Sequence, residues 1–106
     1  MNRPRKLTVA FDVDGTLIDD EDRPRKDIIQ ILVKHAIAGD IVYVWSGGGV
    51  SYASTWVGRL GIERWVDRVI AKQMYTVKPD VAYDDQIVKL GKKNVCVGSG
   101  DHEERW

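Results

Sequence analysis

Two kinds of segment recur along this chain: short runs of β-branched and aromatic residues, and stretches whose apolar residues recur at helical spacing. The longest runs are 7–13 and 41–45, and both are largely apolar, without the regular alternation of a half-exposed strand. Such runs are typical of strands that lie inside a parallel sheet with both faces buried. Shorter runs at 68–71, 81–83 and 94–97 predict three further strands.

Helical spacing appears in the intervening segments. The first helix is predicted to start near Pro24, which suits a first turn, and to end at Gly39, which suits a C-terminal cap. A second is predicted over 51–60, and a short helix or turn over 86–90. His35 lies at the edge of the apolar stripe of the first helix, and we interpret it as a packing or surface residue.

Strands separated by helical segments imply right-handed crossovers and a parallel sheet covered on both faces. The predicted fold class is therefore α/β, a three-layer Rossmann-like sandwich with a central, mostly parallel sheet. The 106 residues allow one domain, which can bury somewhat over about 60% of the surface of the unfolded chain. From about residue 101 no period is evident, and this segment is predicted to be a mobile or lightly docked tail.

Charge and cysteine content narrow the class of protein. Acidic and basic residues are equal in number, so net charge does not indicate nucleic acid or an anionic membrane as a partner, although a local patch is not excluded. Cys96 is the single cysteine, which rules out an intramolecular disulfide, and we expect it to be buried in a strand. The basic start, 1–6, leads into a strand broken by aspartates and not into a signal or membrane segment, so a soluble, cytoplasmic protein is expected.

The first predicted strand ends in acidic residues. Asp12 and Asp14 are separated by one residue, so their side chains share a face while the backbone stays extended, and Gly15 allows a sharp turn after them. Two carboxylates about 4 Å apart repel by roughly 4 kcal/mol at an effective dielectric constant of about 20. A buried pair therefore needs a cation or a shared proton, which indicates a metal site with oxygen ligands. The alternative is a loop in which the aspartates only cap backbone amides.

Other polar residues also follow predicted strands. Ser46 follows the strand 41–45 and begins a glycine-rich turn with Gly47, and Asp84 and Asp85 follow the strand 81–83. In parallel α/β sheets, ligands bind beyond the carboxyl ends of the strands, so these residues should converge.

Each residue type in this set has a task in phosphoryl transfer. A carboxylate can attack phosphorus and form an acyl phosphate, and a second carboxylic acid can protonate the leaving oxygen and then deprotonate water. Mg²⁺ held by carboxylates offsets the negative charge of the phosphate, and a lysine such as Lys78 adds fixed positive charge. Ser46 and the amides of Gly47 and Gly48 can hydrogen-bond phosphoryl oxygens.

Four segments in order along the chain resemble the motifs of the haloacid dehalogenase-like (HAD) hydrolase superfamily. They are Asp-Val-Asp-Gly-Thr at 12–16, Val-Trp-Ser-Gly-Gly at 44–48, Lys-Pro-Asp at 78–80 and Tyr-Asp-Asp at 83–85. The first motif is specific, the ordered set is much more so, and the match covers nearly the whole chain. The resemblance implies a HAD-like core.

By this resemblance Asp12 would be the nucleophile and Asp14 the general acid and base, which favours a phosphatase or phosphotransferase over a dehalogenase. Ser46 would bind the phosphoryl group, and Lys78 would stabilise its charge. Local alternatives stay open, because Ser46 could cap the following helix and Lys78 could be a solvated loop lysine.

The resemblance also implies a bound Mg²⁺. Its ligands would be Asp12, the backbone carbonyl of Asp14, and Asp84, with Asp85 helping directly or through water. Asp85 could instead cap the segment that follows it.

Larger members of the superfamily carry an inserted cap domain, for which this chain has no room. The segment 18–23 is too short for a cap, and 49–76 holds only the core helix, turn and strand. The resulting open site suits a phosphate on a large molecule, or a homo-oligomer in which another subunit closes over it. Arg23, Arg25 and Lys26 either flank the entrance or are solvated.

The predicted function is a Mg²⁺-dependent phosphatase that acts through an aspartyl phosphate on an unidentified phosphomonoester. A second hypothesis is a phosphate- or protein-binding module on the same fold with little turnover. The shortness of the chain and the missing cap motivate it, whereas the full set of expected catalytic residue types argues against it.

Overall fold

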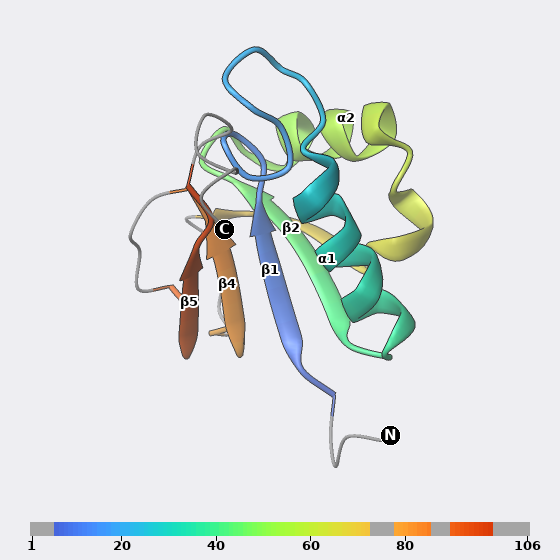
Figure 1. Ribbon diagram of the computed structural model, residues 1–106, viewed down its shortest axis with the longest axis vertical. Coiled ribbons are helices and arrows are strands. Elements are labelled where there is room, and N and C mark those ends of the chain that lie inside the picture. Colours follow the sequence, from blue (N-terminus) through green and yellow to red (C-terminus); the bar gives the residue numbers. More distant parts are fainter. Residues whose placement is uncertain (1–5, 73–77, 86–89, 99–106) are drawn as a thin grey trace.

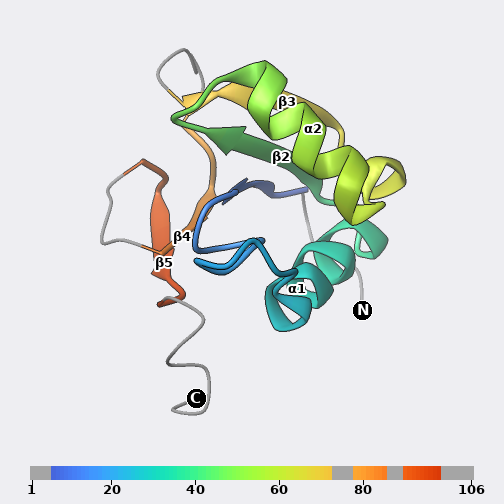
Figure 2. The same ribbon diagram turned by 90° about the horizontal axis from the view of Figure 1, so that it is seen from above.

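A computed structural model of the chain describes residues 6–72, 78–85 and 90–98. Within these residues five parallel strands form one sheet in the order β3-β2-β1-β4-β5 (Figures 1 and 2). The strands are β1 (Thr8–Asp12), β2 (Ile41–Ser46), β3 (Arg68–Ala71), β4 (Val81–Asp84) and β5 (Lys93–Cys96). The α/β class is confirmed, and the sheet is compatible with a Rossmann-like sandwich.

Two α-helices lie where helical spacing predicts them. They are α1 (Lys26–Ile37) and α2 (Val50–Leu60), and a short 3₁₀-helix, η1 (Glu63–Trp65), follows α2. Helix α2 ends at Gly61, which adopts a left-handed conformation with φ of 68°. In the part of the chain that the structure describes, no helix has the length and apolar character needed to cross a bilayer. The helix or turn predicted near 86–90 and the tail predicted from 101 lie, apart from Leu90, outside the described residues.

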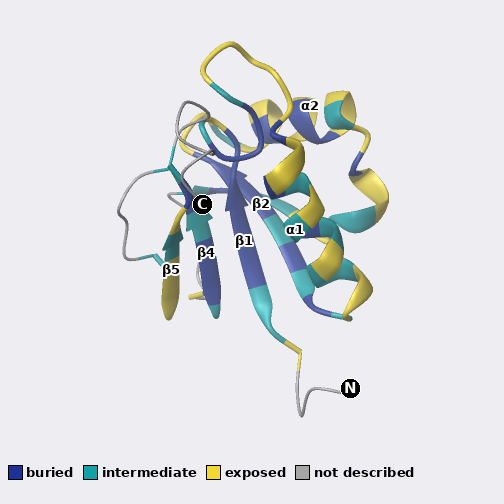
Figure 3. Ribbon diagram, viewed as in Figure 1, coloured by how far each residue is buried: buried dark blue, intermediate teal, exposed yellow. Residues whose placement is uncertain are grey.

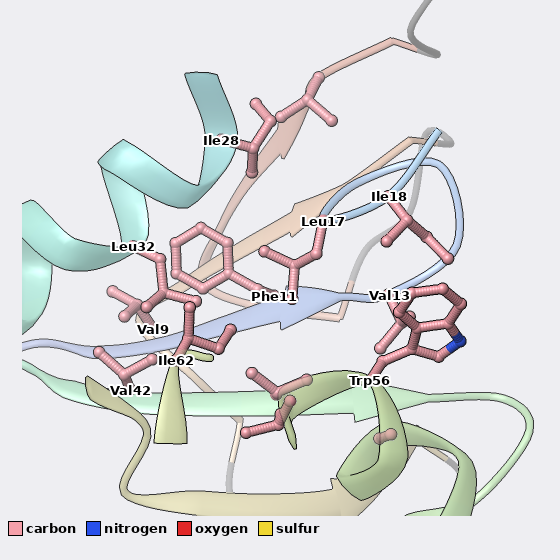
Figure 4. Packing of buried hydrophobic residues seen from close by; sticks show 14 of the residues in the cluster. Val9, Phe11, Val13, Leu17, Ile18, Ile28, Leu32, Val42, Trp56 and Ile62 are labelled. Atoms are coloured by element: carbon pink, nitrogen blue, oxygen red, sulfur yellow. The ribbon is translucent and has the colours of Figure 1, made fainter. Parts of the chain in front are cut away.

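The main core forms between one face of the sheet and the two helices (Figures 2 and 4). Alternate residues of β1 and β2 point into it, and α1 and α2 cover them with apolar side chains. The fully or nearly buried members from these four elements are Val9, Phe11, Val42, Val44, Ile28, Leu32, Ala53, Trp56 and Val57. The opposite face holds a smaller buried cluster of Ala10, Trp45 and Ala82. Strand β1 is therefore buried on both faces, as its apolar run predicts (Figure 3).

A polar network joins the end of α1 to the sheet. Nδ1 of His35 lies 2.7 Å from Oδ2 of Asp40, and Nε2 lies 2.9 Å from the hydroxyl of Tyr83. Asp40 also accepts a hydrogen bond from the backbone N–H of Leu7, and the ring of Tyr83 stacks on Phe11 with centroids 4.5 Å apart. His35 is therefore a packing residue that connects α1, β4 and the start of β1.

Replacing His35 by alanine removes two side-chain hydrogen bonds and an aromatic contact from this network. We expect the free energy of unfolding to fall by about 2–3 kcal/mol, measured by urea denaturation. Lys34→Ala, at the neighbouring exposed position of α1, is the control and should change it by less than about 0.5 kcal/mol. Equal stability of the two variants would contradict a structural role for His35.

Candidate functional site

The carboxyl ends of three adjacent strands carry polar side chains that are almost fully buried. Asp12 ends β1, Ser46 ends β2 and Asp84 ends β4, with exposures of 6%, 2% and 2%. Because β1 pairs in parallel with both β2 and β4, the three ends lie at one edge of the sheet (Figure 1). The structure thus brings Asp12, Ser46 and Asp84 to the same edge of the sheet, as the sequence predicts.

Three carboxylates gather at this edge. Asp12, Asp84 and Asp85 each offer an oxygen, and these oxygens lie within 4.8 Å of one another. Burial raises the pKa of Asp12 to about 7, where the charge of Asp84 adds to the effect and contacts with Lys72 oppose it. Burial also raises the pKa of Asp85, together with its hydrogen bond to Asp84. A group of this kind is stabilised by a cation, and all-oxygen donors suit Mg²⁺ or Ca²⁺ better than a metal that prefers nitrogen or sulfur.

A lysine that was not predicted lies among these acids. Lys72 directly follows β3, and its Nζ lies 2.8 Å from Oδ1 of Asp12 and 2.7 Å from Oδ2 of Asp84. Burial alone would lower the pKa of Lys72, but the hydrogen bonds and charges of the two aspartates outweigh it and raise the pKa. Lys72 therefore stays an ammonium ion that bridges β1 and β4.

The lysine chosen from the sequence lies elsewhere. Lys78 is exposed, two residues before Asp80, whose backbone N–H donates to the carbonyl of Thr8 at the start of β1. This places Lys78 near the amino ends of β1 and β4, at the opposite edge of the sheet from Asp12. The physical reason is that the Lys-Pro-Asp segment leads directly into β4.

Asp14 lies in the loop after β1 and is not a member of the group formed by Asp12, Asp84 and Asp85. Its side chain is exposed, and Oδ1 accepts a hydrogen bond of 2.6 Å from the hydroxyl of Tyr52 on α2. The loop turns at Gly15, which has φ of 80° and lies against the side chain of Asp85. A Cβ at this glycine would collide with the Asp85 carboxylate, so the loop can approach β4 only because residue 15 has no side chain.

One of the two amides expected to bind phosphate after β2 is used within the turn itself. Oγ of Ser46 accepts a hydrogen bond of 3.0 Å from the backbone N–H of Gly48. Ser46 thus stabilises the turn, whereas the N-cap of α2 is Gly49, without a side-chain cap. Gly47 is exposed, and a Cβ built on it would meet nothing within 4 Å. Space is therefore available beside this turn for a ligand oxygen.

Arg25 corrects an expectation. It neither flanks the entrance nor is solvated, since it is only 5% exposed. Its Nη1 donates to the carbonyl of Gly15 at 3.0 Å and to that of Gly98 at 2.6 Å, and Nη2 pairs with Asp27. Arg25 therefore ties the loop after β1 to the segment after β5. Its sequence neighbours are polar, so hydrophobic patterning carries no signal for its burial.

Cys96 also differs from expectation. It is exposed and not buried, because β5 is an edge strand. Its thiol lies 3.6 Å from the carbonyl of Asp85.

Comparison with known proteins does not identify the chain: it matches no family model, no curated protein and no solved structure.

Proposed function

We propose that this protein is a Mg²⁺-dependent phosphomonoesterase that acts through an aspartyl-phosphate intermediate. The observation that carries the proposal is the group of three carboxylates and one lysine, Asp12, Asp84, Asp85 and Lys72, at the carboxyl edge of a parallel sheet. The ordered resemblance to the HAD-like motifs supports the same reaction. A structural salt bridge would need one acid and one base. Here one lysine, Lys72, contacts two carboxylates, Asp12 and Asp84, and a third carboxylate, Asp85, lies beside them.

The acidic group fits a hard divalent cation. The residues that would hold Mg²⁺ are Asp12, Asp84 and Asp85, with the backbone carbonyl of Asp14. When bound, the ion would supply positive charge that offsets the carboxylates and the phosphate.

The protein's own residues carry the remaining steps. A carboxylate oxygen of Asp12 attacks phosphorus, and Asp14 gives a proton to the leaving oxygen. Water then attacks the aspartyl phosphate while Asp14 takes up a proton. Lys72, in place of Lys78, balances the charge on the transferred group, and Ser46 with the amide of Gly47 hydrogen-bonds its oxygens.

The form of the loops bears on the substrate. The loop between β1 and α1 is closed by short bridges between residues 14, 18 and 24, and the segment from α2 to β3 holds only η1. Neither forms a cap over the acidic group. We therefore favour a phosphate on a large molecule, or a small substrate enclosed by another subunit.

The contact of Lys72 favours a second candidate function. Its ammonium bridges Asp12 and Asp84 and so partly compensates their charge without a metal ion. A module that binds phosphate or a protein partner with little turnover could retain this arrangement.

Phosphate release from para-nitrophenyl phosphate tests the proposal. We expect turnover with Mg²⁺, loss to background with a chelator, and recovery when excess Mg²⁺ is restored, because the acidic group needs a cation. Saturable Mg²⁺-dependent binding of phosphate without hydrolysis of any member of a broad phosphate panel would contradict the enzyme and support the binding module.

A further inference from the structure

Tyr52 contacts both the loop after β1, which carries the proposed acid Asp14, and the turn after β2, which is proposed to bind phosphate. It lies in the first turn of α2, and its hydroxyl donates to Oδ1 of Asp14 at 2.6 Å. That distance is at the short end of the range for a hydrogen bond between a hydroxyl and a carboxyl oxygen. In this bond the hydroxyl is the donor and Oδ1 of Asp14 is the acceptor.

The ring of Tyr52 is held by a second contact. A Cβ at Gly48 would lie 3.2 Å from Cγ and Cδ2 of the ring, so the tyrosine packs closely over the backbone of this turn. The same turn is fixed by the hydrogen bond from Gly48 to Ser46. The Tyr52 hydroxyl is therefore anchored through its ring and not only through Asp14.

Among the residues that the structure describes, Tyr52 is the one hydrogen-bond partner of the Asp14 side chain. Asp14 is exposed, in a loop, and the hydrogen bond from Tyr52 spans 38 positions of the chain. An exposed aspartate samples several rotamers, and a general acid must be aligned with the oxygen that receives its proton.

We propose that Tyr52 is a positioning residue for Asp14: its hydroxyl holds Oδ1, so that Oδ2 is the oxygen that transfers the proton. This role rests on the proposed phosphatase function and deepens it. Tyr52 does not exchange its own proton, because it can donate to Oδ1 whether Oδ2 is protonated or not.

The proton balance is as follows. In the first half-reaction the bond from Asp12 to phosphorus forms, the bond from phosphorus to the leaving oxygen breaks, and the proton of Asp14 Oδ2 passes to that oxygen. In the second, a water oxygen bonds to phosphorus, the bond to Asp12 breaks, and a proton of the water returns to Asp14 Oδ2. The ester and water become an alcohol and phosphate, with no other reactant needed.

Leaving-group dependence separates positioning from a merely structural role. Para-nitrophenolate leaves with little need of a proton, whereas phenolate is more basic and depends on the acid. The quantity to measure is kcat/KM, since it reports steps up to formation of the aspartyl phosphate. Tyr52→Phe should lower kcat/KM for phenyl phosphate about 10-fold and for para-nitrophenyl phosphate less than about 2-fold, as expected for loss of one aligned hydrogen bond to a charged group.

Two further variants complete the experiment. Asp14→Asn removes the proposed acid itself and so gives the largest loss of kcat/KM that its misplacement could cause. It should lower kcat/KM for phenyl phosphate by about 10²-fold or more. Tyr43→Phe, a half-buried tyrosine of β2 that belongs to the smaller cluster on the opposite face, is the matched control and should leave both substrates unchanged. Thermal unfolding of all variants shows whether each is folded.

The possible results are distinguishable. A selective loss on phenyl phosphate supports the positioning role. Wild-type values for Tyr52→Phe, or an equal loss on both substrates, overturn it while the proposed function stands. Absence of hydrolysis by the wild-type protein overturns the proposed function and this role together.

Discussion

Asp12→Asn lowers kcat for phosphate release by about 10³-fold or more, because an amide cannot form the acyl phosphate and is a poor ligand for a hard cation. The change is nearly isosteric. It also removes a carboxyl group whose charged form is disfavoured by burial, which raises the pKa of Asp12 to about 7. The variant should therefore still unfold cooperatively. Steady-state assay with Mg²⁺ and an aryl phosphate measures the loss, and urea denaturation checks the fold.

The control for this change is Asp20→Asn, in the exposed part of the loop after β1. It makes the same chemical replacement away from the acidic group, so its kcat should stay within about 2-fold of the wild type. Unchanged turnover in Asp12→Asn would contradict the aspartyl-phosphate mechanism, because Asp12 could not then be the nucleophile.

Lys72→Met has the second large effect, and it acts on both activity and stability. Loss of the ammonium removes charge that stabilises the transferred group, and we expect kcat to fall by about 10²-fold or more. It also leaves Asp12 and Asp84 buried without their shared cation, which should cost about 3 kcal/mol of unfolding free energy in the absence of metal. Activity assay and urea denaturation measure the two effects.

Conditions that replace the lost charge should reduce this destabilisation. Mg²⁺ should restore part of the stability of Lys72→Met, because it supplies a cation to the same carboxylates. Lowering the pH should act in the same direction. The pKa of Asp12 is raised from its ordinary value of 3.8 to about 7, so folding carries the full penalty above about pH 7, and this penalty declines as the pH falls from 7 towards 3.8.

Lys78→Met is the matched control for Lys72→Met. Lys78 is exposed at the other edge of the sheet, so stability should change by less than about 0.5 kcal/mol and activity by less than about 2-fold. A large loss of activity in Lys78→Met with wild-type activity in Lys72→Met would reverse this assignment of the two lysines.

The parts of the fold that local pattern determines were predictable. The apolar runs identify β1 and β2 as interior strands, and the rule that ligand-binding residues follow parallel strands brings together Asp12, Ser46 and Asp84. These predictions need only the order of residues within each strand, together with the shared direction of the strands.

Features that depend on strand order were not predictable from local pattern. Cys96 lies in a run that resembles an interior strand, but β5 is at the edge of the sheet, and only the three-dimensional order decides this. Lys72 could have been found by the rule already applied to the aspartates, because it directly follows β3.

The central place of β1 in the sheet has a consequence for biosynthesis. This strand is translated before both of its neighbours, and one of them, β4, is not complete until Asp84. The hydrogen bond from the Thr8 N–H to Asp80 spans 72 positions, and such distant pairings form late and slowly. A nascent chain on the ribosome should therefore expose β1 without β4, and the group of Asp12, Asp84 and Asp85 should assemble only after β4 has emerged.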